Sequence, residues 1–267
     1  GEISGIEHLA AANGLDRSTD NITLIAGPLI GGIVFHTLGL LGTCIVICSM
    51  LVIAVFLIVR VPSHPRTNNI TEVSVFSDIQ KGLRFALRRP VILRVLLTTV
   101  IFNFCVWPLW ALMPVVADTR LGLDTSWTGI LMSITGVGSL AGALCVASFV
   151  RPQHYQATFF YGSTLFLLSI LLFSLSDNLW LSSIIFLVSG VGLAGFSTMQ
   201  TTIIFSVSPP EMRSTVLGIV VTCIGTSPAG IALAGILADQ IGATNGLALV
   251  ACGGLLAMAL LRMIITD

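Results

Sequence analysis

Residues 40–59 read LLGTCIVICSMLVIAVFLIV, an uncharged run of twenty residues. An α-helix needs about 20 apolar residues to cross the hydrocarbon core of a bilayer, so this run predicts one transmembrane helix. Similar apolar runs occupy most of the remaining chain, separated by short polar joints. The predicted spans are residues 22–38, 40–59, 91–117, 126–150, 157–175, 179–206, 214–237 and 246–265. We therefore predict an all-α fold, a polytopic helical membrane protein with eight transmembrane helices.

The overall composition excludes several classes of protein. The 267 residues are 55% hydrophobic and 9% charged, whereas soluble domains are about 25% charged. A net charge of zero gives no reason to expect nucleic acid as a partner. The sequence also lacks a phosphate-binding glycine loop, a metal-spaced histidine pair and a nucleophile elbow. We therefore expect the lipid bilayer as a partner, and neither enzymatic activity nor a metal or cofactor.

Basic residues are distributed unevenly between the two ends of the predicted spans. When successive joints alternate across the membrane, eleven of the twelve Lys and Arg residues fall on one side and Arg120 alone on the other. Cytoplasmic loops carry an excess of Lys and Arg. This distribution predicts that both termini of the chain are cytoplasmic, in a multi-pass protein of the cell membrane, most simply a bacterial inner membrane.

The longest polar joint, between Arg60 and Pro90, contains its own helical pattern. From Val75 to Arg89 most apolar side chains recur at helical spacing, while basic ones occupy another face. This pattern is typical of an amphipathic helix on the inner membrane surface. A partner-binding or regulatory helix is the alternative interpretation.

Three motifs resemble elements of the major facilitator superfamily. Residues 27–32, GPLIGG, resemble the glycine-proline motif on the fifth helix of its exporters. Residues 76–85, FSDIQKGLRF, followed by Arg89-Pro90, are similar to the joint between the two halves in the drug and siderophore exporter branch, which includes the enterobactin exporter. Residues 209–213, PPEMR, ahead of Val216-Leu217-Gly218, resemble the cytoplasmic turn before the eleventh helix.

This resemblance implies helices five to twelve of a twelve-helix transporter, with the first four helices absent. It divides the chain into residues 1–60, the end of the amino-terminal helical half with two helices; residues 61–90, a cytoplasmic central loop; and residues 91–267, the six-helix carboxy-terminal half. The implied function is secondary active export of small organic molecules, such as drugs or siderophores, by alternating access. The joint at residues 151–156 lacks the charged gate motif that many members carry. The alternatives are a truncated membrane protein that inserts without transporting and a membrane-embedded enzyme or scaffold.

Polar side chains in the middle of two spans are candidates for a substrate cavity. Asn103 and Trp107 lie one turn apart in the third span, and Gln200 lies in a polar patch of the sixth. Polar groups in hydrocarbon need partners or water, and an amide beside a flat aromatic ring suits an organic substrate. Interhelical hydrogen bonding by Asn103 and Gln200 is the alternative.

The glycine-proline motif places Gly27, Pro28, Gly31 and Gly32 in the first span, three of them without side chains. Small residues allow neighbouring membrane helices to approach closely. The resemblance implies that this motif seals the inward-open state and favours export. Ordinary small-residue packing is the alternative.

Charged residues inside the spans are scarce. Arg213 and Asp239 stand at the two ends of the seventh span and are candidate gate residues, although a solvated loop arginine is the more ordinary interpretation of Arg213. No Asp or Glu lies at mid-membrane, where ion-coupled carriers usually place one. We therefore expect the residues that bind the coupling ion, for which protons are the candidate, in the absent first four helices. The alternative is that this segment is not itself the ion-coupled transporter.

Overall fold

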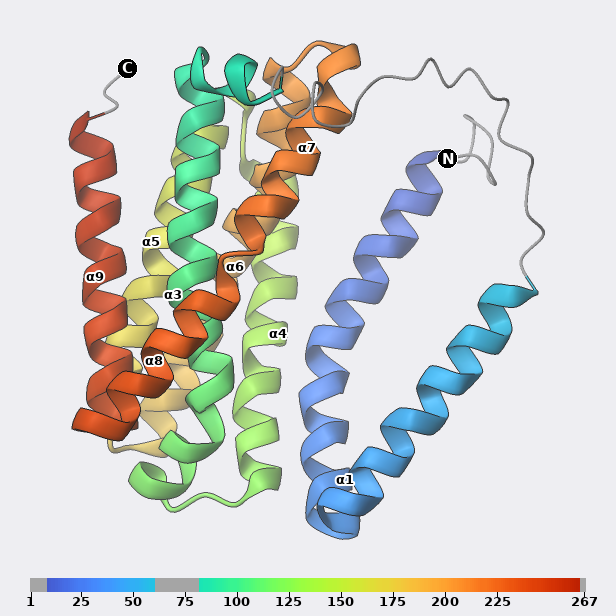
Figure 1. The fold of residues 1–267 in the computed structure, drawn as a ribbon, viewed down its shortest axis with the longest axis vertical. Coiled ribbons are helices and arrows are strands. Elements are labelled where there is room, and N and C mark those ends of the chain that lie inside the picture. The colour runs from blue at the N-terminus through green and yellow to red at the C-terminus, as the bar shows by residue number, and fades with distance from the viewer. Residues whose placement is uncertain (1–8, 61–81, 265–267) are drawn as a thin grey trace.

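The computed structural model describes residues 9–60 and 82–264, and all regular structure in these ranges is helical (Figure 1). Residues 82–87 form one helical turn, and the prediction for residues 75–81 lies outside the described residues. The helices are α1 (Leu9–Val59), α3 (Pro90–Leu121), α4 (Thr125–Phe149), the 3-10 turn η2 (Pro152–His154), α5 (Tyr155–Ser174), α6 (Leu179–Val207), α7 (Pro210–Ile224), α8 (Ser227–Ile241) and α9 (Ala243–Ile264). The predicted all-α membrane fold is confirmed.

The first helix turns back on itself at Gly39. Within the described residues, seven helical stretches are long and apolar enough to cross a membrane, and the first of them, Ile22–Val59, has 38 residues. A straight helix of that length would span about 57 Å, nearly twice the hydrocarbon thickness. Gly39 has φ 64° and ψ −171°, a conformation that glycine adopts without steric cost. Figure 1 shows the two legs reversing there, so this stretch supplies two of the eight predicted spans.

Helix ends coincide with the predicted polar joints because those joints supply caps. The Asp124 carboxylate accepts a hydrogen bond from the Trp127 amide at 2.9 Å, and the Asn178 side chain accepts one from the Trp180 amide at 2.8 Å. Each cap satisfies a donor that the first helical turn leaves without a partner. Gly122 ends α3 in the left-handed conformation, with φ 61°.

The span predicted over residues 214–237 contains a break in its helix. It is divided into α7 and α8 near Gly225. Pro228 cannot donate a backbone hydrogen bond, and the Thr226 hydroxyl bonds the Cys223 carbonyl oxygen at 2.8 Å. The two pieces together, Glu211–Ile241, still form one membrane-length stretch.

Glycines bring the helices of the bundle into backbone contact. α6 lies between α4 and α5 (Figure 1). A methyl group at Gly162 of α5 would lie 2.8 Å from the carbonyl oxygen of Gly192 in α6. At Gly142 of α4 it would lie 2.8 Å from the α-carbon of Val191. Such distances leave no room for a side chain, so these helices pack as small residues allow in membranes.

The glycine-proline motif meets α4 through one of its glycines. A methyl group at Gly32 would lie 2.7 Å from the Thr125 carbonyl oxygen and 3.2 Å from the Gly129 α-carbon. At Gly27 or Gly31 the same group would meet no described atom within 4 Å. The glycine-proline motif is therefore in close contact with α4 at Gly32 and open at the other two glycines.

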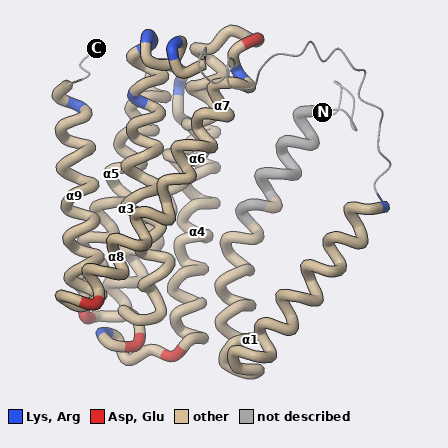
Figure 2. The backbone as a smooth tube through the Cα atoms, viewed as in Figure 1, with Lys and Arg blue, Asp and Glu red and all other residues tan. Residues whose placement is uncertain are grey.

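Charged residues divide the two ends of the bundle (Figure 2). We call the end that holds Arg84, Arg88, Arg89, Arg94, Arg151, Arg213 and Arg262 the Arg-rich side. The opposite end, the Asp-rich side, holds Asp118, Arg120, Asp124, Asp177 and Asp239. The helical connections therefore put Arg120 and the other arginines of residues 82–264 at opposite ends, as the alternation of the predicted joints requires, and Glu211 also lies on the Arg-rich side.

We predict that Gly32→Ala destabilises the protein and that Gly31→Ala does not. The added methyl at position 32 must displace backbone atoms of α4, and such overpacking typically costs about 1–3 kcal/mol. At position 31 the methyl meets open space, so the change should stay within about 0.5 kcal/mol of zero. Denaturant unfolding in detergent micelles measures both variants. Equal stability of the two would contradict the close contact between α1 and α4.

Candidate functional site

Four residues in the bundle are linked by hydrogen bonds that meet at the backbone carbonyl and the hydroxyl of Thr99. The Asn103 amide nitrogen donates to the Thr99 carbonyl oxygen at 2.9 Å, and its amide oxygen accepts from the Trp107 indole nitrogen at 3.0 Å. The Gln200 amide nitrogen donates to the Thr99 hydroxyl at 2.7 Å. That hydroxyl donates in turn to the Val95 carbonyl oxygen at 2.8 Å. We call Thr99, Asn103, Trp107 and Gln200 the amide–indole network.

The network lies at the seam between α3 and α6 and extends to an open face of α3. Asn103 is 6% exposed, whereas Trp107 is 44% exposed. Gln200 reaches across from α6, while the other three residues rise along one side of α3 at spacings of four. One end of the network is therefore fixed by protein and the other, the indole ring, is accessible.

The structure joins all three residues predicted for the cavity and adds Thr99, which the sequence analysis did not select. Gln200 makes an interhelical bond, as one of the two predictions for it expects, and Asn103 bonds within α3. An asparagine or glutamine amide can make up to four hydrogen bonds. Within the described residues, Asn103 and Gln200 use only part of this capacity in the network. That both residues line a substrate cavity therefore stays a prediction.

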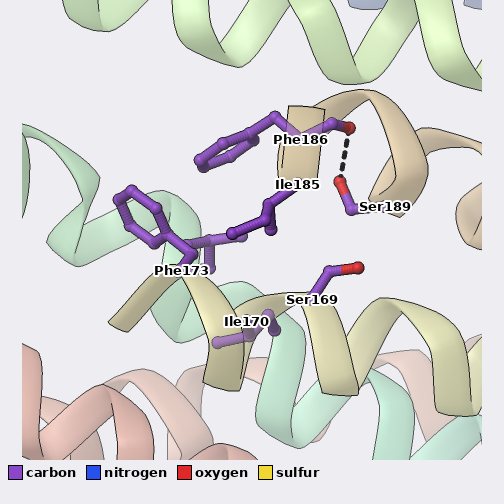
Figure 3. A pocket seen from close by; sticks show the side chains of 7 residues that line it. Ser169, Ile170, Phe173, Ile185, Phe186 and Ser189 are labelled. Atoms are coloured by element: carbon purple, nitrogen blue, oxygen red, sulfur yellow. Dashed lines mark hydrogen bonds between the residues drawn. The ribbon is translucent and has the colours of Figure 1, made fainter. Parts of the chain in front are cut away.

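Two hollows of the bundle lie apart from the network. A cavity of about 10 Å³ between α3, α5 and α6 is lined by Ser169, Phe173 and Ser189. The Ser189 hydroxyl bonds the Phe186 carbonyl oxygen of its own helix (Figure 3). This volume suffices for about one water molecule, and so the cavity is a packing void.

The second hollow is an apolar groove of about 430 Å³ between α3, α8 and α9. Phe104, Leu237 and Val250 are among its walls. It lies on a different side of α3 from Thr99 and Asn103 because its α3 walls are Val100, Ile101, Phe104 and Cys105. The groove therefore does not include the amide–indole network.

Two arginines on the Arg-rich side bond to neighbouring elements. A guanidinium nitrogen of Arg94 donates to the Gln156 amide oxygen of α5 at 3.0 Å. Arg213 donates to the Ser208 carbonyl oxygen at 3.2 Å and to that of Phe205 at 3.0 Å. These carbonyls end α6, and a cation there complements the helix dipole. The predicted gate residue Arg213 thus caps α6, while Asp239 lies exposed near the end of α8.

Two contacts with aspartate side chains join helices on the Asp-rich side. The His36 ring nitrogen lies 3.9 Å from a carboxylate oxygen of Asp124, which joins α1 to the beginning of α4. Arg120 pairs with Asp177, joining the end of α3 to the α5–α6 loop. The hydrogen bond from Arg120 lowers the pKa of Asp177 below its ordinary value. Neither pair follows from the sequence, since both join residues more than fifty positions apart.

Comparison with known proteins agrees with this architecture. The transmembrane secretion effector family matches residues 1–266 of the chain. The multidrug efflux pump Tap of Mycolicibacterium fortuitum is 26% identical over 237 residues, which are 86% of this chain and 57% of the pump. A crystal structure of a bacterial homologue of the human lysosomal transporter Spinster, inward-facing and unoccupied, aligns with a TM-score of 0.62 at 12% identity. The alignment covers 97% of this chain and 70% of that one.

The fold is that of a multi-pass helical membrane protein with a polar network between its helices. The match over residues 1–266 identifies the family: the chain belongs to the transmembrane secretion effector family of the major facilitator superfamily. It spans 57% of the length of the curated efflux pump that it matches.

We predict that Asn103 and Trp107 are energetically coupled. Because Asn103→Leu removes the acceptor of the indole N–H, a double-mutant cycle with Trp107→Phe should give a coupling free energy of about 0.6–1 kcal/mol. The matched control is Trp110→Phe on the same helix, whose coupling to Asn103→Leu should be close to zero. Unfolding in detergent supplies the four stabilities of each cycle. Equal coupling in both cycles would show that the Asn103–Trp107 hydrogen bond is not formed.

Proposed function

We propose that this chain is part of a secondary transporter that exports small organic molecules by alternating access. The amide–indole network is the observation that carries the proposal. It is uncharged, it presents an accessible indole face, and it keeps hydrogen-bonding capacity at two amides. Aromatic rings stack on such a face, and a few polar groups in a largely apolar wall orient organic ligands.

Drug-like molecules and catechol siderophores are the substrates we propose. Both classes combine an aromatic surface with hydrogen-bonding groups, which the Trp107 ring and the Asn103 and Gln200 amides complement. The efflux-pump name of the 26% identical relative supports the first class. The resemblance of residues 76–85 to the siderophore exporter branch supports the second.

We place the Arg-rich side in the cytoplasm, in a bacterial inner membrane, with both termini of this chain on that side. The excess of arginine there supports this orientation. Residues 61–90 then form a cytoplasmic joint between residues 1–60, from the amino-terminal half, and residues 91–267, the carboxy-terminal half.

In this arrangement the contact between α1 and α4 joins the two halves. Gly32 against Gly129 and His36 near Asp124 lie toward the Asp-rich side, so they would close the outer side of the transporter. The open faces at Gly27 and Gly31 would adjoin other parts of the amino-terminal half, whereas the carbonyl oxygen of Pro28 lies against Gly129 of α4. Arg213 on the inner side and Asp239 on the outer side stay candidate gates, and protons stay the candidate coupling ion.

We predict that Asn103→Leu and Gln200→Leu change the range of exported substrates without lowering the amount of protein in the membrane. Removing an amide should weaken export of substrates that bond to it by about 10-fold, the equivalent of one hydrogen bond, and spare purely apolar ones. Efflux assays with dyes, antibiotics and catechol siderophores, in cells that express the full coding sequence, measure this range.

The matched control is Gln240→Leu, which removes an exposed amide near the end of α8, outside the network. Its substrate range should equal that of the unaltered protein. Uniform loss of every substrate in Asn103→Leu and Gln200→Leu would assign the network to stability alone. Absence of efflux by the unaltered protein would overturn the proposed transport.

A further inference from the structure

The turn that leads into α3 is attached to the bundle by one face and exposed on the other. Gly82 and Ala86 are buried. A methyl group at Gly82 would lie 3.1 Å from the Ile219 side chain of α7, and Thr215 is also in contact there. Because this face is held by α7, the exposed face of residues 82–89 has a fixed position at the Arg-rich end of the bundle (Figure 2).

The exposed face combines two leucines with three arginines. Leu83 and Leu87 are 45% and 58% exposed and lie one turn apart. Arg84 and Arg88, also one turn apart, are both exposed. Arg89 is exposed as well. We call Leu83, Arg84, Leu87, Arg88 and Arg89 the leucine–arginine surface. Helices at a membrane interface carry exposed apolar side chains beside basic ones. The two leucines and the neighbouring arginines of this short segment have that arrangement.

The charge of this surface is not neutralised by its own segment. Residues 82–94 contain four arginines and no acidic residue. The Arg89 guanidinium lies 5.5 Å from the centre of the Phe85 ring, a contact that orients the arginine and keeps its charge. The arginines of this surface favour an anionic ligand, and the exposed leucines beside them favour one that also offers hydrocarbon.

We propose that the leucine–arginine surface binds the headgroups of anionic phospholipids in the leaflet next to it. Arg84 and Arg88 bond the phosphate oxygens, and Leu83 and Leu87 enter the adjoining acyl region. Arginine is suited to this role because its fork of donors matches phosphate geometry. Since Gly82 lies against Thr215 and Ile219 of α7, bound lipid also stabilises the packing of that turn on α7. The inference rests on the placement of the surface at a membrane interface and not on transport.

Lipid-dependent stability of the full-length protein in a neutral detergent tests this proposal. Phosphatidylglycerol and phosphatidylcholine with the same acyl chains are titrated separately, and the thermal unfolding midpoint is followed. Phosphatidylglycerol should raise the midpoint at lower lipid concentration than phosphatidylcholine. Each basic residue near an anionic surface contributes about fivefold in affinity. Arg84→Gln/Arg88→Gln should therefore weaken the phosphatidylglycerol effect by about 30-fold and leave the phosphatidylcholine effect unchanged.

Two control variants separate charge at this surface from general charge and folding. Arg151→Gln makes the same type of change on the Arg-rich side, outside the surface, and should weaken phosphatidylglycerol binding less than about threefold. Arg84→Lys/Arg88→Lys keeps the charge and should retain most of the effect. If the double glutamine variant does not fold, loss of the phosphatidylglycerol preference on raising the salt concentration tests the same electrostatic contact.

Different contrary results would lead to different conclusions about the lipid proposal. Equal effects of the two lipids on the unaltered protein, or a double glutamine variant that responds like the unaltered protein, would overturn the proposal. Full competition by soluble glycerol phosphate would assign the surface to a free phosphate compound instead of a membrane lipid. Because none of these assays measures transport, failure of the lipid proposal and failure of the proposed export function are distinguishable.

Discussion

In hydrocarbon, a leucine gains little by leaving lipid for another helix, so the contacts that hold this bundle come from close packing and hydrogen bonds. Glycine makes the close packing available. Where Gly162 meets Gly192 and Gly32 meets Thr125, the helices touch through backbone atoms, and a single added methyl would have to displace them. The spread of glycine through apolar spans is thus part of what stabilises the fold.

The hydrocarbon that surrounds the helices also explains which features the sequence predicts well. Backbone groups in hydrocarbon must bond within their own helix, so an uncharged run such as residues 40–59 predicts a helix whatever its neighbours are. Polar joints predict helix ends because Asp124 and Asn178 supply caps locally. Hydropathy alone does not predict the break near Gly225, where Gly225, Thr226, Ser227 and Pro228 stand within an otherwise apolar run.

Contacts between distant residues could not be predicted in this way. Asn103, Trp107 and Gln200 are recognisable in the sequence by their polarity. Thr99 connects them only because α6 packs against α3, and no local sequence pattern predicts that these two helices are neighbours. Likewise Gly31 and Gly32 are equivalent in sequence. The rotation of α1 against α4 alone makes one a contact and leaves the other open. His36 near Asp124 and Arg120 with Asp177 depend on the same long-range packing.

The network, the α1–α4 contact and the leucine–arginine surface all acquire their proposed roles from one placement, with the chain threaded through a membrane and its Arg-rich side inward. Single cysteines in a protein otherwise freed of its six native ones test this placement directly. Gln153→Cys lies on the Arg-rich side and Gln240→Cys near the end of α8 on the other. A membrane-impermeant maleimide should label position 240 in intact cells and position 153 only after permeabilisation. Labelling of position 153 in intact cells would contradict the account.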